Sequence, residues 1–421
     1  MSYKKIINPI FFVILLYFFL GLLNINNIYF LADESVYSNS VYSIIDGKLD
    51  NNNHPLLAKT IWAYFVFLAQ GISGIDKPIF WRIGTILFSV AGLIIFYKLA
   101  RTILNKNFAF LAVSLLAFDP MYFSFGRIMN LDTISHFFNL ASLYLLIKYF
   151  QSKQQKFIYG GAFLLGLSLA VKLSVIFLVI FLPFLLVVLG DFRKRRIAEV
   201  TVSILKFYFF VALGFVLGNS IYFFINHFGV SFITYSIDLV SSQITMQKFE
   251  EGYLYSSTIS WFTVPQILTL YRIDFGKNVE SILAFQNPIM FMTTFVSIIW
   301  TAVALLSKKL ENSKVWILVL FWFFLQYVPY LFNIHTTYYY YIITLLPIII
   351  LIFINLTNSL KYSNLIFRIA FAISLFIFIL YYPLLIGLKV PKKYELTLFK
   401  YSLYNYPAKD SIFCQNCSPR K

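Results

Sequence analysis

The segment Ile6–Ser40, IINPIFFVILLYFFLGLLNINNIYFLADESVYSNS, joins a long apolar run to two adjacent acids, Asp33 and Glu34. The run from Ile6 to Leu23 is long enough for a membrane span, because a helix needs about 20 apolar residues to cross the hydrocarbon core. It is too long for the apolar core of a cleavable leader and lacks a small-residue cleavage site, so we expect the span to be retained. The segment therefore predicts a membrane protein with an acidic pair directly after its first span.

The composition of the chain supports this class. Hydrophobic residues make up 60% of the chain and charged residues 12%, whereas ordinary soluble proteins carry about 25% charged residues. The mean hydropathy is +0.78. We therefore expect an all-α polytopic membrane protein whose residues 1–390 form one transmembrane domain. The apolar runs predict eleven helical spans, near residues 7–27, 79–100, 108–125, 133–150, 158–171, 173–190, 203–225, 288–306, 315–332, 338–356 and 366–388.

The distribution of charge predicts the orientation. The net charge of +17 comes from basic residues clustered in short loops, such as 193–196 and 308–314. Short basic loops at alternate crossings are typical of cytoplasmic loops, so the charge indicates membrane topology and not nucleic-acid binding. The N-terminus is then cytoplasmic, and the tail 391–421 lies outside. Of the 17 acids, only three fall on the cytoplasmic side, which suggests that the outer face carries the function.

Two long extracytoplasmic loops are predicted, at residues 27–77 and 226–287. The first contains LLAKTIWAYFVFLAQGI (56–72), which is too short to span comfortably and suits a helix at the membrane interface. Long loops on a rigid scaffold often carry function. Cys414 and Cys417 form a C-x-x-C in the tail, which we interpret as an incidental pair or, if the tail is exported, as a disulfide.

The first loop holds a candidate acid–base group. Asp33 and Glu34 alone could be a solvated acidic turn, but His54 and Lys59 follow in NNNHPLLAKTIW. A carboxylate with an ordinary pKa is ionised at neutral pH and can accept the proton of an attacking hydroxyl. The loop therefore predicts general-base chemistry.

Three basic residues lie at or near membrane depth, namely Arg82, Arg127 and Lys172. Charged groups in apolar segments are costly and usually face a cavity or a partner. Arg82 could reach the interface, and Arg127 could pair with Asp132, five residues later. Lys172, in LGLSLAVKLSVIF, has no acid near it in sequence. Three cations near the outer face suit an anionic ligand such as a lipid phosphate.

Aromatic residues form a third group. HTTYYYYIITLLP begins at His335 and carries four consecutive tyrosines from Tyr338 onward. These tyrosines could form an interfacial aromatic belt, or they could line a sugar- or lipid-binding wall with their apolar faces and polar tips. Trp261 in the second loop has the same two interpretations.

Together these residues resemble the protein O-mannosyltransferase family, membrane glycosyltransferases of the GT-C class that use dolichyl-phosphate-mannose. The resemblance extends from about residue 30 to 350. In chain order, the matching segments are the Asp33-Glu34 pair, HPLLAK for the family's His-Pro-Pro-Leu-Gly-Lys at His54–Lys59, Arg82 in the second span, FDPMYFSFGRIMNLD with its acids Asp119 and Asp132, GLSLAVKLS around Lys172, and SSTISWFTVP with FQNPIMFM in the second loop.

The chain also departs from the family pattern. Leu56 and Ala58 replace the second Pro and the Gly of the histidine motif, and Asn52 replaces an acid upstream of it. Gly126 stands for a Ser, and His335 stands for an Arg of prokaryotic relatives. The second loop is too short for the lumenal sugar-binding insert of eukaryotic members. These changes bear on the donor sugar and the acceptor more than on the class of reaction.

The resemblance implies a GT-C fold and an inverting transfer of a hexose, such as mannose, from a polyprenyl- or dolichyl-phosphate sugar to an acceptor hydroxyl on the outer face. Asp33 is then the general base, and Glu34 positions the base or the acceptor. Negative charge builds on the leaving phosphate, and Arg82, Lys172 and Arg127 are the candidates to stabilise it. The expected substrate pocket is completed by His54, Lys59, Asp132, Trp261, His335 and Tyr338.

We expect no metal and no other cofactor, because these basic side chains can neutralise the phosphate. The acceptor could be a Ser or Thr of an exported protein, a lipid or a glycan, and the sequence does not separate these. A transporter is the alternative from another class, but it predicts ionisable residues near the bilayer centre and inverted repeats. The acids crowd at one face, and the sequence shows no repeat.

Overall fold

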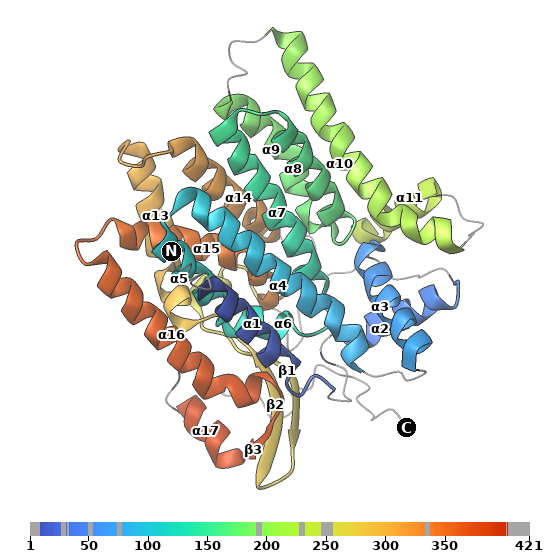
Figure 1. Ribbon diagram of the computed structural model, residues 1–421, viewed down its shortest axis with the longest axis vertical. Coiled ribbons are helices and arrows are strands. Elements are labelled where there is room, and N and C mark those ends of the chain that lie inside the picture. The colour runs from blue at the N-terminus through green and yellow to red at the C-terminus, as the bar shows by residue number, and fades with distance from the viewer. Residues whose placement is uncertain are drawn as a thin grey trace, which may run out of the picture.

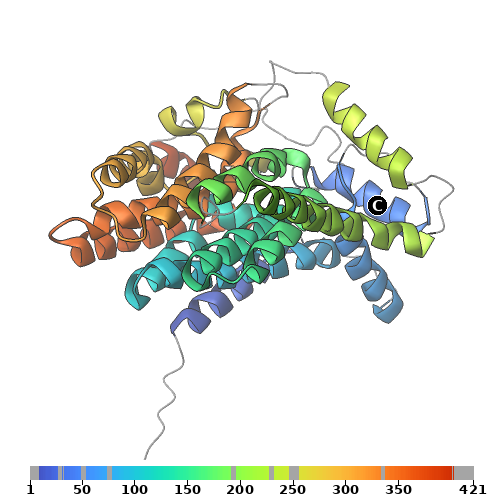
Figure 2. The ribbon, with the colours of Figure 1, turned by 90° about the horizontal axis from the view of Figure 1, so that it is seen from above.

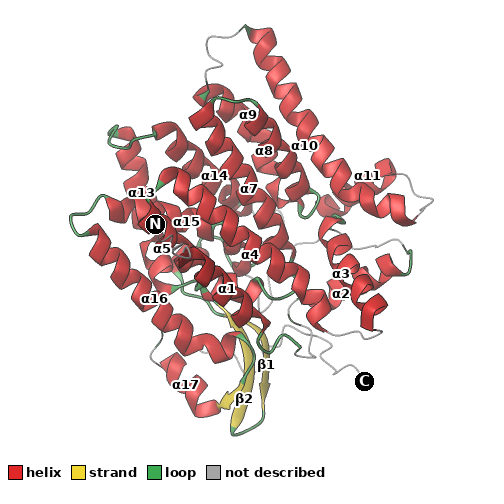
Figure 3. Ribbon diagram, in the orientation of Figure 1, coloured by secondary structure: helices red, strands yellow, loops and turns green. Residues whose placement is uncertain are grey.

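The computed structural model describes residues 9–26, 31, 33–48, 54–73, 78–190, 196–226, 232–245, 256–332, 337–400 and 402 of the chain. Helices dominate these residues (Figures 1 and 3). The helices are α1 (Pro9–Leu22), α2 (Glu34–Ile45), α3 (Leu57–Ser73), α4 (Pro78–Ile103), α5 (Lys106–Ala117), α6 (Pro120–Phe125), α7 (Leu131–Ser152), α8 (Lys156–Leu169), the 3₁₀ helix η1 (Leu173–Val175), α9 (Ile176–Leu189), α10 (Ile197–Asn226), α11 (Phe232–Thr245), α12 (Ser260–Thr263), α13 (Pro288–Leu306), α14 (Ser313–Leu331), the 3₁₀ helix η3 (Tyr339–Thr344), α15 (Leu346–Asn358), α16 (Ser363–Leu385) and α17 (Lys392–Lys400).

Each of the eleven predicted spans contains a helix. Among the described residues, five helices (α4, α10, α13, α14 and α16) are long and apolar enough to cross a membrane, and five shorter helical segments are also apolar. The number of crossings therefore stays a prediction. Three predicted spans are interrupted. Pro120 starts α6 after a break at Asp119, and a 3₁₀ helix precedes both α9 and α15.

Short polar side chains fix where several helices begin. Asn105 accepts the Phe108 N–H, and Asn130 accepts the Thr133 N–H. Asn287, followed by Pro288, caps α13 by accepting the Ile289 N–H. Asp119 caps α6 by accepting the N–H groups of Met121 and Tyr122 and also accepts the Asn287 N–H. Such caps satisfy the free N–H groups at helix starts, and Asp119 in addition ties two distant helix starts together.

Helices α8 and α10 make a close crossing through two glycines. A Cβ added at Gly166 would overlap the backbone of Val211, and a Cβ added at Gly214 would overlap the backbone of Phe163. Small residues let helix backbones approach closely, which is a common form of packing within membranes. The contact holds α8, and therefore the chain that follows it, in a fixed position.

The connecting elements gather at one end of the bundle. Figure 1 shows α2, α3, the β-strands and α17 at the lower end of the long helices, with α11 beside the end of α10. Seen from above in Figure 2, α10 and the shorter α3 lie on the same side of the bundle. A second apolar cluster, separate from the main core, includes Tyr37 of α2, Trp62 of α3, Ala170 after α8 and Leu239 of α11. The two long loops of the sequence therefore pack against each other.

The second loop also contains a small sheet, drawn yellow in Figure 3. Strand β1 (Leu268–Asp274) pairs antiparallel with β2 (Asn278–Ala284), and β2 pairs antiparallel with β3 (Lys389–Pro391). Helix α17 follows β3, and its buried Glu395 accepts hydrogen bonds from Arg272 of β1 at 2.9 and 3.3 Å. The all-α prediction missed this sheet. It joins the first part of the predicted tail to the second loop.

Candidate active site

The acidic pair begins α2, where Glu34 forms a buried ion pair. Its carboxylate accepts two hydrogen bonds from Arg82 of α4, at 2.9 Å from Nε and 2.6 Å from Nη2. The backbone N–H groups of Leu31 and Met129 also donate to it, at 2.9 and 3.0 Å. Arg82 donates a further bond to the Ile25 carbonyl at 2.6 Å. Glu34 and Arg82 thus fix the start of α2 against α4 and against the segment before α7.

Arg127 makes a comparable set of contacts with backbone oxygens. Its guanidinium donates to the Leu23 carbonyl at 2.5 Å and to the Leu385 carbonyl at 3.2 Å, and it lies 5.9 Å from the centre of the Phe123 ring. Leu23 directly follows α1, and Leu385 is the last residue of α16. No ion pair joins Arg127 to Asp132 among the interactions of the described residues, although their sequence spacing allowed one. Arg127 instead holds two helix ends together.

Lys172 has an acidic partner that the sequence did not indicate. The chain leaves α8 at Ala170, and Lys172 is extended (φ −150°, ψ 130°) before η1 begins. Its Nζ donates to both carboxylate oxygens of Asp132, at 2.7 and 2.9 Å, and lies 4.0 Å from the centre of the Tyr341 ring. The predicted spans 158–171 and 173–190 leave Lys172 between them, and the structure has a break between helices at this position. The break turns the ammonium group into the space between α7 and η3.

Asp33 lies near this ion pair. It is half-buried and stands at the N-cap of α2, directly before Glu34. Burial raises the pKa of Asp33 to about 6, while the charge of Lys172 lowers it and that of Asp132 raises it. Asp33, Lys172 and Asp132 therefore share one electrostatic environment. A carboxyl group with a pKa close to neutrality is well suited to act as a general base.

The histidine motif reaches the same place from α3. The Leu57 N–H donates to the Ala170 carbonyl at 3.1 Å, which attaches the motif to the end of α8. Lys59 is fully buried, and its Nζ donates to the His54 carbonyl at 2.8 Å. Burial, together with the charges of Lys172 and Lys59, lowers the pKa of His54 to about 3. The imidazole is therefore neutral at physiological pH and can donate and accept hydrogen bonds without adding charge.

Aromatic rings cover the opposite side of Lys172. Tyr341 stacks on Tyr330 with 5.0 Å between ring centres, and Tyr338 stacks on Tyr340 at 5.5 Å. Trp261 is buried, lies 6.3 Å from Tyr341, and donates its indole N–H to Ser256 at 2.9 Å.

The second loop is tied to the start of this tyrosine run. The Ser256 N–H donates to the Thr337 carbonyl at 3.0 Å, and the Thr337 hydroxyl donates to the Ser256 carbonyl at 2.7 Å. Of the predicted aromatic residues, Tyr338 and Trp261 lie in this cluster. It is Tyr341 that contacts the ammonium group.

Tyr37 also belongs to the site, although sequence reasoning did not select it. It follows Asp33 by four residues, so the two lie on one face of α2. Its ring is 6.4 Å from that of His54 and 5.5 Å from that of Trp62. Burial raises its pKa well above the usual range, as do the charges of Asp33 and Asp132. The spacing from the acid was the one available signal.

Three expected residues remain without a place. His335, Cys414 and Cys417 lie outside the described residues. No group of three or more His, Cys, Asp or Glu side chains that could hold a metal ion occurs in the described parts of the chain. The expectation that no metal is needed stays a prediction.

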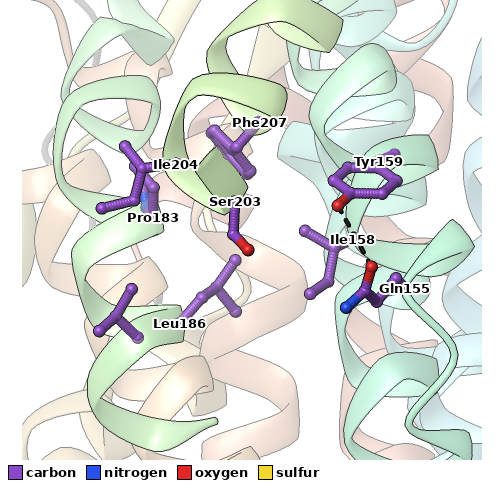
Figure 4. Close-up of a pocket in the computed structure, with 9 residues that line it drawn as sticks. Gln155, Ile158, Tyr159, Pro183, Leu186, Ser203, Ile204 and Phe207 are labelled. Carbon is purple, nitrogen blue, oxygen red and sulfur yellow. Dashed lines mark hydrogen bonds between the residues drawn. The ribbon is translucent and has the colours of Figure 1, made fainter. Parts of the chain in front are cut away.

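A separate crevice lies between α8, α9 and α10, near the ends of these helices that adjoin loops 152–156 and 190–196 (Figure 4). Its walls are mainly apolar, including Ile158, Pro183, Leu186 and Phe207. It contains none of the candidate site residues, so we assign it no part in the chemistry.

Comparison with known proteins identifies related sequences and folds. Residues 51–222 match a family model described as dolichyl-phosphate-mannose-protein mannosyltransferase. This segment contains all three of the predicted cations, Arg82, Arg127 and Lys172, and the histidine motif, whereas Asp33 and Glu34 precede it. None of the curated proteins compared with the chain gives a match.

Solved structures share the fold at low sequence identity. A chain of the S. cerevisiae protein O-mannosyltransferase Pmt1-Pmt2 complex bound to the sugar donor has a TM-score of 0.79 at 11% identity, covering 99% of this chain and 96% of that one. ArnT from Cupriavidus metallidurans bound to undecaprenyl phosphate has a TM-score of 0.55 at 11% identity, covering 94% and 73%. The archaeal oligosaccharyltransferase AglB from Archaeoglobus fulgidus, in complex with an inhibitory peptide and a dolichol-phosphate, has a TM-score of 0.53 at 12% identity, covering 95% and 58%. The predicted GT-C fold is thus confirmed.

Proposed function

We propose that this protein transfers a hexose from a polyprenyl-phosphate sugar to an acceptor hydroxyl. It is a membrane protein that has the GT-C glycosyltransferase fold and is related to the protein O-mannosyltransferases through residues 51–222. Mannose and dolichyl phosphate are the proposed donor components, and a Ser or Thr of an exported protein is the proposed acceptor. The observation that carries the proposal is the buried Lys172–Asp132 pair beside the Tyr341 ring, whose two charges act on the pKa of Asp33.

In the proposed reaction, the Asp33 carboxylate accepts the proton of the acceptor hydroxyl. The hydroxyl oxygen attacks the anomeric carbon from the face opposite the phosphate, and the bond between that carbon and the phosphate oxygen breaks. The sugar is transferred with inversion, and the polyprenyl phosphate leaves with the bonding electron pair. A positioned general base contributes typically about 10²–10⁴-fold to such a step.

Lys172 is the proposed partner of the leaving phosphate. Its ammonium group has three donor hydrogens, and the contact with Asp132 does not use all of them. A fixed cation near the developing negative charge stabilises the transition state more than the ground state. Asp132 and the Tyr341 ring hold the ammonium in place, and the neutral His54 and Tyr37 offer polar atoms to the sugar or the acceptor.

For Arg82, Arg127 and Glu34 we propose positioning roles in place of direct contact with substrate. Arg82 is occupied by Glu34 and by a carbonyl, and Arg127 donates to two carbonyls. Lys59 similarly supports the backbone of His54. These contacts set the direction of α2 and of the histidine motif, and they act on catalysis through Asp33 and His54.

The charge pattern supports a further part of the proposal, in which the N-terminus is cytoplasmic and the site faces outward. The end of α7 and the starts of α8 and α10 lie at the end of the bundle opposite to α2 and α3 (Figure 1), and Lys153, Lys156 and Arg196 stand at these helix ends in the sequence. Short basic loops mark cytoplasmic ends. The donor lipid would then be used on the outer face.

The test is transfer from labelled dolichyl-phosphate-mannose to a Ser/Thr-rich peptide by the protein purified into vesicles. We expect Asp33→Asn to reduce the single-turnover rate by about 10²-fold or more, and Lys172→Met to reduce donor use with any acceptor. Asp46→Asn is the matched control, because Asp46 is an exposed acid at the far end of α2. Full activity of Asp33→Asn would remove Asp33 as the base. If wild-type protein consumes the labelled donor only with lipid or glycan acceptors, the protein acceptor is ruled out, and no consumption at all would favour the transporter alternative.

A further inference from the structure

Helix α11 has a face that packs on the first loop. Tyr235 and Leu239 are only 6% and 4% exposed, and they belong to the apolar cluster that contains Tyr37 and Val41 of α2 and Trp62 of α3. Their spacing of four residues places them on the same side of α11. This face attaches α11 to the helix that starts with the acidic pair.

A different face of α11 is apolar and exposed. Ile233, Ile237 and Val240 are 71%, 62% and 50% exposed. Their i, i+4, i+7 spacing forms one stripe along the helix, and a surface hollow runs beside it. Asp238 points away from this stripe, since it lies about 100° around the helix from Ile237. Helix α11 therefore has two apolar faces, and only one is used within the described chain.

The surroundings of the stripe indicate a lipid partner. Helix α10 precedes α11 and exposes Phe209, Val216 and Leu217, whose apolar side chains face outward as in a membrane-spanning helix. Five residues separate α10 from α11 in the sequence, so the start of α11 can lie at most about 20 Å from the end of α10. The stripe bears no charge that would select a charged protein partner. Exposed apolar side chains therefore occur both on α10 and on α11, the helix that follows it in the chain.

Among the described helices, α11 belongs neither to those that are long and apolar enough to cross a membrane nor to the shorter apolar ones. Its 14 residues measure about 21 Å, which is less than the roughly 30 Å of the hydrocarbon core. We propose that α11 lies along the membrane surface with Ile233, Ile237 and Val240 in the lipid boundary. Such a helix buries its apolar side about 5–10 Å into the headgroup and acyl boundary. Through Tyr235 and Leu239, the bilayer then supports the position of α2.

This inference does not depend on the proposed reaction, and it can be tested without an activity assay. Cys414 and Cys417 are replaced by Ser, and single cysteines at position 233, 237, 240 or 238 are labelled with a nitroxide. The full-length protein is reconstituted into phosphatidylcholine/phosphatidylglycerol vesicles. Power saturation then compares accessibility to oxygen, which concentrates in lipid, with accessibility to a water-soluble nickel chelate.

We expect labels at positions 233, 237 and 240 to show a several-fold higher oxygen-to-nickel ratio than the label at position 238, which is the matched control on the same helix. Equal ratios at all four positions would overturn the proposal. Spectral broadening at position 237 that disappears on dilution with unlabelled protein would also overturn it, because a second copy would then cover the stripe. Loss of label mobility only on addition of an acceptor peptide would overturn it in favour of a peptide site.

Discussion

The buried pair formed by Glu34 and Arg82 allows a quantitative test of how the acidic turn is held. Both side chains are almost fully buried, and two hydrogen bonds join them. Removing one partner of such a pair leaves an uncompensated buried charge, which costs about 3–5 kcal/mol. Since folded domains are stable by only about 5–15 kcal/mol, either Glu34→Gln or Arg82→Met alone should strongly lower the free energy of unfolding.

The double variant Glu34→Gln/Arg82→Met removes both charges, so it should cost less than the sum of the two single changes. Groups in direct contact typically show a coupling of about 0.5–3 kcal/mol, and this buried pair should lie near the upper end. Thermal unfolding in detergent gives the stability, and donor titration in the same samples gives the KM. Asp46→Asn serves as control, because the Asp46–Lys48 pair is exposed and should contribute little.

Two results would refute this reasoning. Additive stability effects would mean that the two side chains do not depend on each other. An equal rise in donor KM on Arg82→Met in the wild-type and Glu34→Gln backgrounds would mean that Arg82 contacts the donor phosphate itself. The expected result is that Arg82→Met has little further effect on transfer once Glu34 has been changed.

Three further predictions concern pH, helix packing and the sheet. The transfer rate should rise with pH, reach half its plateau near pH 6 and be about tenfold lower at pH 5, because burial raises the pKa of Asp33 to about 6 and only its ionised form accepts a proton. Asp132→Asn should lower this midpoint, because the negative charge of Asp132 raises the pKa of Asp33. Transfer rates at several pH values measure both effects. A rate that does not change with pH would contradict the assignment of Asp33 as the base. Gly214→Ala should destabilise the protein by about 1–3 kcal/mol, because the added methyl group meets the α8 backbone. Gly71→Ala is the control, since a Cβ has open space there, and it should leave the melting temperature unchanged or higher. Glu395→Gln should loosen α17 from the sheet, because it removes the buried negative charge that pairs with Arg272. Limited proteolysis should then cleave near residue 392 faster than in wild type.

Sequence alone could place most helices and most members of the candidate site, but it could not pair their charges. Glu34 lies 48 residues from Arg82, and Asp132 lies 40 residues from Lys172. Pairs at such separations depend on the way helices pack. The short spacing from Arg127 to Asp132 suggested a contact, yet Asn130 starts α7 between them. Asp132 then contacts Lys172, the residue before η1, while Arg127 contacts the ends of α1 and α16.

The sheet was missed for a related reason. Strands β1 and β2 are seven residues each. Strand β3, which pairs with β2, comes more than 100 residues later. Short strands in a mixed polar and aromatic loop give little periodic signal. Tyr37 had a clear position relative to Asp33 in the sequence, but its importance depends on the packing of α2 on α3.

The break in the chain between α8 and η1 explains why the separate motifs meet. A helix that continued through residue 172 would use the Ala170 carbonyl internally and would carry Lys172 along its own face. Because the helix ends, that carbonyl is free to accept the Leu57 N–H, as unpaired carbonyls at helix ends require a partner. The same end lets Lys172 extend to Asp132 and Tyr341. One local interruption, held in place by the close glycine crossing of α8 and α10, therefore positions both the histidine motif and the proposed phosphate partner beside Asp33.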